Sequence, residues 1–168
     1  MIFVTVGTHE QSFNRLIEAV DNLVRDNQIV EPVFMQIGYS TYLPKYTEYS
    51  KFLDFEKMNH MIESADVIVT HGGPASFLNA ISSGKRPVVV PRQLKFNEHV
   101  NNHQIEFVEQ IVQRNYPIDL VRNIDDLMPI INENKIKSGT FVSQSQNEKF
   151  IEMFSEVIKD IFNDSKKL

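Results

Sequence analysis

Short runs of apolar, mostly β-branched residues alternate along this chain with segments whose apolar residues recur at helical spacing. Ile2–Val6 and Pro32–Ile37 are two such runs, each followed by a glycine, and 66–70 is the clearest of them. Continuous apolar runs of this length are typical of strands that are buried on both faces of a parallel sheet. Because strands that alternate with helices fold into α/β domains, the sequence predicts a parallel sheet with helices on both faces.

The same pattern gives approximate bounds for each element of an α/β, Rossmann-like parallel sheet flanked by helices. The expected strands cover residues 2–6, 32–37, 52–55, 66–70, 87–91 and 118–121, and the expected helices cover 13–25, 57–65, 74–83, 99–114, 125–132 and 146–162. Ser12 is expected to cap the first helix and Pro74 to open the helix at 74–83. The segments 39–49, 92–98 and 135–145 are expected to be loops. Since ligands bind such sheets beyond the carboxyl ends of the strands, candidate site residues should follow the strands.

Length and composition are those of an ordinary globular domain. The chain has 168 residues, of which 42% are hydrophobic and 23% are charged, and it contains no linker or internal repeat. We therefore expect residues 1–168 to form a single domain. The absence of cysteine removes thiol catalysis and cysteine-ligated metal sites. The net charge of −5 argues against a nucleic-acid partner, because phosphate binding requires a basic face.

Nothing in the sequence predicts a membrane span or a leader. No stretch approaches the ~20 apolar residues that a membrane-spanning helix needs. The first seven residues, Met1–Gly7, have no basic region and end at a glycine, which is typical of a strand and not of a signal peptide. We therefore expect a cytoplasmic protein.

The turn at residues 70–76 is the sharpest local feature, because it joins an expected buried strand to an expected helix. The helix begins with N–H groups at Ala75 and Ser76 that are expected to be free, and such a terminus binds anions. His71 could add a hydrogen bond to a phosphate oxygen. The candidates for phosphate binding are His71, Gly72, Gly73, Pro74, Ala75 and Ser76. A tight turn that needs glycine only for its geometry is the alternative.

The loop Gly7–Glu10 follows the first expected strand in the same way. It contains neither the G-x-G-x-x-G pattern of dinucleotide-binding proteins nor a P-loop, so NAD binding and NTP hydrolysis lose support. Thr8 and the backbone after Gly7 could reach a second phosphate. A simple strand end explains the glycine equally well.

A third polar segment, Glu98–Gln104, is rich in neutral donors and acceptors that suit sugar hydroxyls. His99 and His103 are four residues apart and are expected to share a helix face, a spacing that can bind a metal ion. The chain has no cysteine and no H-E-x-x-H pattern, so we expect no metal site.

Charged and aromatic residues elsewhere are less specific. The basic residues expected near the ligand end of the sheet are Lys85, Arg86, Arg92 and Lys95. They could face phosphates or anionic lipid headgroups, or they could be solvated surface. The aromatic segment Tyr39–Tyr49 and the segment Leu94–Phe96 are candidates for a partner surface, because exposed aromatic residues often mark interfaces. They could equally belong to the core.

The loops taken together resemble a known family. The matching segments are Val6–Glu10 with Ser12 and Phe13, Ala65–Ser76, Pro87–Arg92 and Glu98–Gln104. They resemble the C-terminal, donor-binding half of GT-B glycosyltransferases in the peptidoglycan N-acetylglucosaminyltransferase and Alg13 group. Within it they look most like the Alg13-like subunits of bacterial capsule and exopolysaccharide synthesis. The likeness spans about residues 1–110.

The resemblance implies a UDP-sugar site. Gly7 and Thr8, with the turn at 71–76, would hold the diphosphate, and Phe55 falls where family members bind uracil through the backbone. Asn79 stands where the family commonly has an acidic residue that grips the ribose, so here the contact would lack a charge. The full set of UDP-sugar-binding candidates is Gly7, Thr8, Phe55, His71, Gly72, Gly73, Pro74, Ala75, Ser76, Asn79, Arg92, Asn102, His103 and Gln104, the last three of which would address the sugar.

The resemblance also implies that the chain is half of an enzyme. A whole GT-B enzyme has two such domains, and in Alg13-like systems a separate membrane-anchored chain resembling Alg14 binds the lipid-linked oligosaccharide acceptor. The expected reaction is inverting transfer at the inner face of the cell membrane, without a metal or other cofactor. UDP-galactose is the first expectation for the donor, with UDP-glucuronate and UDP-N-acetylglucosamine as alternatives. His9 and Glu10 are candidate general bases, although a base from the partner is favoured.

Other functions remain open at this point. A non-catalytic subunit that binds a UDP-sugar and regulates or stabilises its partner would share the pocket. A UDP-sugar epimerase shares the GT-B fold, but such enzymes carry both domains in one chain, so the length of 168 residues counts against it. Assembly into a homo-oligomer is also left open by the sequence.

Overall fold

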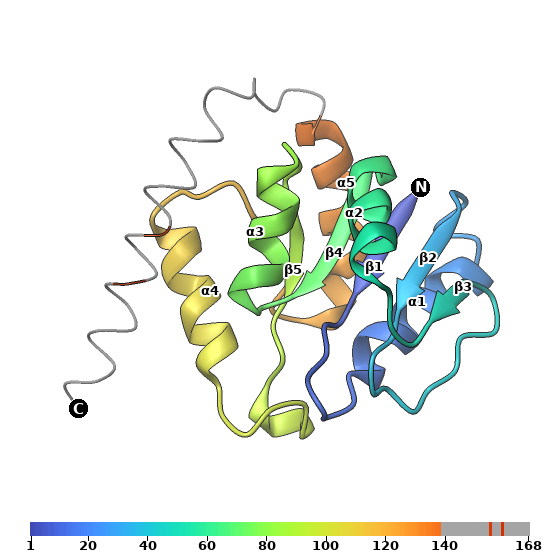
Figure 1. The fold of residues 1–168 in the computed structure, drawn as a ribbon, viewed down its shortest axis with the longest axis horizontal. Helices are drawn as coiled ribbons and strands as arrows, with labels where there is room; N and C mark the ends of the chain where they lie inside the picture. The colour runs from blue at the N-terminus through green and yellow to red at the C-terminus, as the bar shows by residue number, and fades with distance from the viewer. Residues whose placement is uncertain (139–154, 156–158, 160–168) are drawn as a thin grey trace.

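The computed structural model describes residues 1–138 together with Ser155 and Lys159 (Figure 1). In chain order the elements are β1 (Ile2–Thr5), α1 (Asn14–Arg25), β2 (Val33–Gln36), β3 (Glu48–Ser50), α2 (Phe55–Ser64), β4 (Val67–His71), α3 (Pro74–Ser82), β5 (Val88–Val90), the 3₁₀ turn η1 (Leu94–Phe96), α4 (His103–Gln113), β6 (Asp119–Leu120), the 3₁₀ turn η2 (Ile124–Asp126) and α5 (Leu127–Ser138). The helix expected over 146–162 lies outside the described residues, except for Ser155 and Lys159, which are helical.

The six described strands form one parallel sheet in the order β3-β2-β1-β4-β5-β6. This is the strand order of a Rossmann-like doubly wound sheet, and it confirms the expected fold class. The order reverses between the neighbouring strands β1 and β4, which pair in register from Ile2 opposite Val67 to Thr5 opposite Thr70. The loops after these two strands therefore diverge to opposite faces and leave a crevice at the carboxyl edge.

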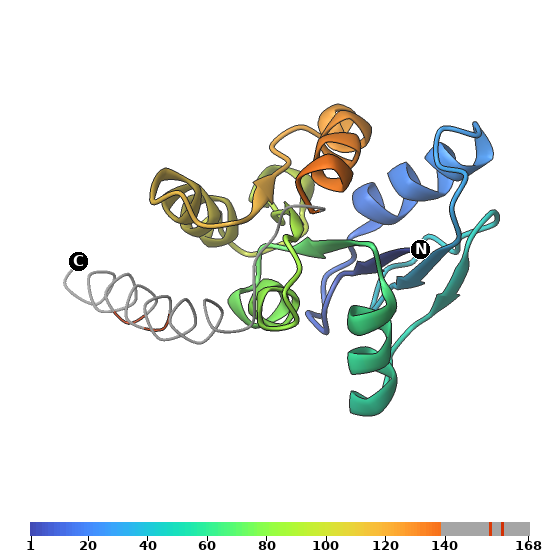
Figure 2. The same ribbon diagram turned by 90° about the horizontal axis from the view of Figure 1, so that it is seen from above.

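Helices cover both faces of the sheet, as the view from above shows (Figure 2). α1 and α5 pack on one face against Ile2, Val4 and Val69. α2, α3 and α4 pack on the other face, where Phe3 is among the buried contacts of α2. Successive residues of β1 thus point to opposite apolar layers, which explains its uninterrupted apolar sequence.

The start of α1 differs from the prediction. Ser12 does not cap the helix, because its Oγ donates to the Tyr39 carbonyl at 3.3 Å, and α1 begins at Asn14 with Phe13 in the cap position. The N–H of Phe13 donates instead to Ser40 Oγ at 3.1 Å. A hydroxyl from a distant loop therefore holds the residue that precedes the helix, and no side chain of the described residues caps its first turn.

The strand expected at 52–55 is also wrong. The third strand is β3 at Glu48–Ser50, within the segment expected to be a loop. Asp54 caps α2, since its carboxylate accepts from the Lys57 N–H at 2.7 Å, and Phe55 is the first helical residue. The cap ends the extended segment before an aromatic strand can form.

The later helices also shift from their expected bounds. α4 begins at His103 and not at residue 99, because residues 98–102 form a turn in which Asn101 Oδ1 accepts from the His103 N–H at 3.1 Å. His99 and His103 therefore do not share a helix face. α5 continues to Ser138, so the loop expected from residue 135 is helical over its first residues. Across the described residues, no helix is both long enough and apolar enough to cross a membrane.

Candidate functional site

A pocket of about 860 Å³ opens at the carboxyl ends of β1 and β4, where the strand order reverses. Its described lining consists of Thr5, Gly7, Thr8, His9, Glu10, Gln36, Phe52, Leu53, Met58, Ile62, His71, Gly73, Pro74, Ala75, Ser76 and Asn79. The loop after β1 and the turn after β4, both predicted to carry the site, are therefore brought together. Their partner across the pocket is the segment from β3 into α2.

His71 organises the turn between β4 and α3. Its Nδ1 accepts a hydrogen bond from the Gly73 N–H at 2.8 Å, and its Nε2 lies 2.9 Å from Ser76 Oγ. Because Nδ1 is an acceptor, the neutral ring carries its proton on Nε2 and donates it to Ser76. The Ser76 hydroxyl hydrogen is then left to point at a ligand. Both ring nitrogens of His71 are therefore engaged within the turn, so any effect of His71 on a ligand would pass through Ser76.

The charge state of His71 follows from its surroundings. Burial, together with the positive charge of Arg92 and the nearby rings of His9 and His99, lowers the pKa of His71 to about 3. The ring is therefore neutral at physiological pH. A neutral ring keeps the donor and acceptor pattern at Gly73 and Ser76 fixed.

Two glycines are required by the position of the His71 ring. A Cβ on Gly7 would lie 2.3 Å from His71 Nε2, and Gly7 also has a φ of +73°. A Cβ on Gly73 would lie 2.2 Å from His71 Cε1. The glycines thus let both loops close around the imidazole, which supports the geometric explanation for these glycines, while ligand binding at the turn stays a prediction.

The N-terminus of α3 faces the pocket with fewer free backbone N–H groups than the sequence predicted. Pro74 occupies the first turn and has no N–H, and the Ser76 N–H donates to the Gly73 carbonyl at 3.1 Å. The expectation of a free N–H at Ser76 is therefore wrong. Within the described part of the chain the Ala75 N–H has no acceptor, so it remains available to an anion at the positive end of the helix dipole.

Gln36 is a site residue that the sequence did not reveal. It is buried at the end of β2, where its Oε1 accepts from Thr5 Oγ1 at 2.7 Å and from the Gly7 N–H at 3.2 Å. Its Nε2 donates to the carbonyls of Gly7 at 3.0 Å and Lys51 at 2.9 Å. One amide therefore fixes the Gly7 loop to the end of β3. A polar residue at the end of an otherwise apolar strand was the available signal.

The side of the pocket opposite α3 is apolar. It is formed by Phe52, Leu53, Met58 and Ile62, and Asn79, which also lines the pocket, belongs to α3. Phe55, whose backbone was expected to bind uracil, is 79% exposed, and nearby residues of the same segment line the pocket. Exposure of the side chain does not bear on a backbone contact, so the expected uracil contact at Phe55 stays a prediction.

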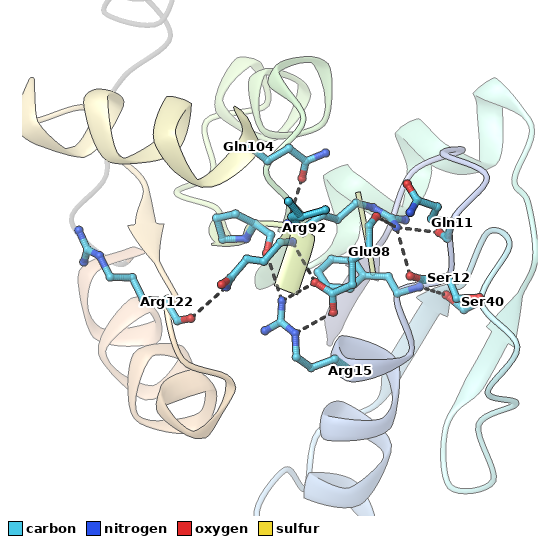
Figure 3. Close-up of polar contacts among 12 residues, drawn as sticks. Gln11, Ser12, Arg15, Ser40, Arg92, Glu98, Gln104 and Arg122 are labelled. Carbon is cyan, nitrogen blue, oxygen red and sulfur yellow. Dashed lines mark hydrogen bonds and ion pairs between the residues drawn. The ribbon is translucent and has the colours of Figure 1, made fainter. Parts of the chain in front are cut away.

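Arg92 is absent from the described lining of the pocket, and its guanidinium instead contacts backbone carbonyls (Figure 3), so its expected ligand contact stays a prediction. It is fully buried, and its Nη1 donates to the Gln11 carbonyl at 2.7 Å and the Glu98 carbonyl at 3.1 Å, while Nη2 donates to the Val6 carbonyl at 2.9 Å. Burial lowers the pKa of Arg92 to about 10, opposed by the charge of Glu98, so the side chain stays protonated at neutral pH. Arg92 fastens the loop after β1 to the loop after β5.

The other basic residues are also structural or remote. Lys85 Nζ donates to the Ala65 carbonyl at 2.7 Å, and Arg86 pairs with Asp119 at 2.8 Å. Both lie before β5, at the amino edge of the sheet, so they do not flank the ligand end as expected. Lys95 is exposed on η1, where its Nζ lies 4.7 Å from the centroid of the Phe96 ring.

The residues expected to address the sugar are divided. Gln104 Oε1 accepts from the N–H groups of Gly72 and Arg92, both at 3.1 Å, so it joins the β4–α3 turn to the end of β5. Asn102 Oδ1 accepts from the Leu94 N–H at 3.0 Å, and His103 is exposed. These three residues are absent from the described lining of the pocket. Their sugar contacts stay a prediction for the liganded protein.

Comparisons with known proteins agree with this architecture. Residues 1–162 match the glycosyltransferase family 28 C-terminal domain. The UDP-N-acetylglucosamine transferase subunit ALG13 of Homo sapiens is 34% identical over 120 residues, which cover 66% of this chain and 10% of that protein. The corresponding mouse protein matches over the same share of its length, so the chain spans about a tenth of the curated relatives that it matches.

Solved structures agree at the level of the fold. The glycotransferase of kitacinnamycin has a TM-score of 0.60 at 19% identity and covers 89% of this chain and 37% of its own. The calicheamicin glycosyltransferase CalG4 has a TM-score of 0.56 at 17% identity and covers 90% of this chain and 36% of its own. The resemblance to an Alg13-like GT-B C-terminal domain is thus confirmed, and the chain belongs to the glycosyltransferase family 28 C-terminal domain family.

Proposed function

We propose that this chain binds a UDP-sugar and supplies the donor half of an inverting glycosyltransferase. The observation that carries the proposal is a single pocket in which the N-terminus of α3 faces an apolar wall. A nucleoside diphosphate has the matching parts, an anionic diphosphate and a flat apolar base. In the pocket these would lie against Ser76 and against Phe52 and Met58, respectively.

The diphosphate would be held without a cationic side chain. Among the described residues that line the pocket, none is Lys or Arg. The remaining groups are the Ala75 N–H, the hydroxyls of Thr8 and Ser76, and the positive end of the α3 dipole. Donors fixed in this way stabilise the charge that develops on a leaving diphosphate. We therefore propose a transfer that needs no metal ion.

We propose a setting for the reaction in which this chain works with a partner. Human ALG13 is named as a subunit of a UDP-N-acetylglucosamine transferase, which supports a chain that works with a partner. The partner we propose is a membrane-anchored chain of the Alg14 kind that presents a lipid-linked oligosaccharide at the cytoplasmic face. The proposed process is bacterial capsular or exopolysaccharide synthesis. UDP-galactose is the first donor to test, and UDP-glucuronate and UDP-N-acetylglucosamine are the alternatives.

Calorimetry with UDP and ADP tests the binding proposal on the chain alone. We expect UDP to bind and ADP to bind more weakly, because the backbone at Phe55, proposed to hydrogen-bond uracil, meets a different pattern of donors and acceptors on adenine. Ser76→Ala should weaken UDP binding about tenfold, because it removes a proposed hydrogen bond to the charged diphosphate worth ~1.4 kcal/mol. His71→Ala should weaken it by a similar factor, because Ser76 then loses the donor that orients its hydroxyl. His60→Ala, at an exposed position of α2, is the matched control. Equal affinity for the two nucleotides, or no loss in either variant, would contradict the proposal.

A further inference from the structure

His9 has a defined tautomer, because a chain of hydrogen bonds fixes which ring nitrogen carries the proton. Gln11 Nε2 donates to the Asn97 carbonyl at 3.1 Å, which orients the amide and leaves Gln11 Oε1 facing His9 Nε2 at 2.9 Å. An amide oxygen only accepts, so His9 Nε2 must donate. The proton of the neutral ring is therefore on Nε2, and nothing in the described part of the chain donates to Nδ1, which leaves its lone pair available.

His99 fixes the plane of the same ring. The imidazoles of His9 and His99 stack with centroids 4.7 Å apart and an interplanar angle of 19°. They come from the loops after β1 and β5, which meet at the carboxyl edge of the sheet. Burial and, as the next largest cause, the ring of His9 lower the pKa of His99, so a positive charge on His99 is disfavoured beside His9. A group held in one plane, with one nitrogen free, is arranged as a proton acceptor.

His9 also lies beside the groups proposed to hold the diphosphate. It lines the same pocket as Thr8 and Ser76. Glu10 lines the pocket as well, but its side chain is exposed and accepts no hydrogen bond from the described residues that would fix its orientation. Of the two candidate bases that the sequence suggested, the geometry therefore favours His9.

We propose that His9 Nδ1 is the general base of the transfer, with Gln11 and His99 as positioning residues; this inference rests on the proposed function. The acceptor hydroxyl gives its proton to Nδ1 while its oxygen forms a bond to the anomeric carbon of the donor sugar. The bond from that carbon to the diphosphate oxygen breaks, and UDP leaves with the electron pair. Charge balances, because one proton moves to the ring as one anion departs.

The tautomer is tested first, on the full chain, by ¹⁵N NMR of the histidine rings. Spectra of His9→Gln and His60→Gln assign the His9 and His60 signals. We expect His9 to show a protonated Nε2 and an unprotonated Nδ1, and Gln11→Leu to give a mixture of the two tautomers. A His9 ring protonated on Nδ1 in the unmodified chain would overturn the proposal.

The catalytic role is tested by sugar transfer from the UDP-sugars above, with the chain co-expressed with the product of the adjacent reading frame. His9→Gln should lower kcat about 100-fold or more, while the affinity for UDP stays within twofold. Gln11→Leu should lower kcat and shift the acidic limb of the pH profile, and Gln11→Glu should move that limb to higher pH by stabilising the protonated ring. His60→Gln should leave transfer unchanged.

The charged and titratable groups that bear on this profile are His71, His99, His103, Arg92 and the adjacent Glu10. Glu10→Gln therefore accompanies the series and should retain the acidic limb. Wild-type transfer by His9→Gln would overturn the inference while leaving UDP binding intact. Failure of the unmodified chain to bind UDP would instead overturn the proposed function. The tautomer of His9 is measured without nucleotide, so it does not depend on that outcome.

Discussion

At the scale of single residues, the imidazole of His71 explains why the pocket is built from glycine. The backbone at Gly73 has a φ of −74°, which any residue can adopt, so only the ring of His71 excludes a side chain there. At Gly7 the backbone conformation and the ring both exclude one. Gly73 is therefore the position where the packing around His71 can be disturbed without straining the backbone.

Gly73→Ala should weaken UDP binding at least tenfold while the chain stays folded. The new Cβ would meet His71 Cε1 at 2.2 Å, so the ring must move and release Ser76. Calorimetry measures the affinity, and circular dichroism checks the fold. Ser82→Ala, exposed at the far end of α3, is the control. Unchanged UDP affinity in Gly73→Ala would argue that the ring position is irrelevant to binding.

Asp21 is a second residue whose surroundings set its chemistry. Its carboxylate accepts hydrogen bonds from Tyr42 Oη, the Lys45 N–H, the Tyr46 N–H and Thr47 Oγ1 at 2.8 to 3.2 Å. Burial alone raises the pKa of Asp21, but these donors outweigh it and hold the pKa below 3.8. The carboxylate thereby fastens the loop that leads from β2 to β3.

Because the folded pKa is lowered, the stability that Asp21 contributes is present above pH 3.8 and is lost as pH falls through the lower folded value. Asp21→Asn should lower the free energy of unfolding by about 1–3 kcal/mol, since the amide cannot accept from all its donors. Urea denaturation between pH 7 and pH 3 measures this, and the difference from wild type should shrink at the acid end. Asp125→Asn, at an exposed site, should show no such difference. A constant difference across that range would contradict the role of the charge.

At the scale of elements, structure that depends on neighbouring residues was predicted well, and structure that depends on contacts between distant residues was not. The glycines and proline at residues 72–74 correctly predicted where β4 ends and α3 begins, because the turn depends on those residues themselves. The start of α1 was wrong, because Ser40, 27 positions away from Phe13, supplies the hydroxyl at that terminus. The position of β3 was wrong, because the aromatic residues near 52–55 carry a strand propensity that the Asp54 cap overrides.

Arg92 joins elements that are distant in sequence, which leads to a third prediction. Arg92→Met leaves the carbonyls of Val6 and Gln11 without their donor and removes the positive charge beside Glu98. We expect a loss of about 3 kcal/mol or more in the free energy of unfolding, measured by urea denaturation. Arg114→Met, exposed at the end of α4, should change it little. An Arg92→Met chain of unchanged stability that no longer binds UDP would support the ligand role that the sequence suggested.

At the scale of the whole molecule, the fold class was predictable and the direction of side chains was not. Apolar periodicity determines which segments are strands, and parallel order follows from their alternation with helices. The same information placed the Gly7 loop and the 71–76 turn at one edge of the sheet. It could not show that Arg92 points inward or that Gln36 reaches the Gly7 loop, because both depend on contacts across more than 25 positions.

The last prediction concerns the stability of the whole chain when the nucleotide binds. A ligand that binds only the folded state stabilises it, and at 100 times its dissociation constant the gain is about 2.7 kcal/mol. For a domain of this size, that gain should raise Tm by about 5–10 °C. Thermal unfolding with UDP should show this rise, ADP at the same concentration should give a smaller one, and His71→Ala should reduce the effect of UDP. The diphosphate is proposed to bind the N-terminus of α3 and the hydroxyls of Thr8 and Ser76, and not a metal ion. EDTA should therefore leave the UDP-dependent rise in Tm unchanged. A rise abolished by EDTA would show that a metal ion carries the charge that we assign to the helix.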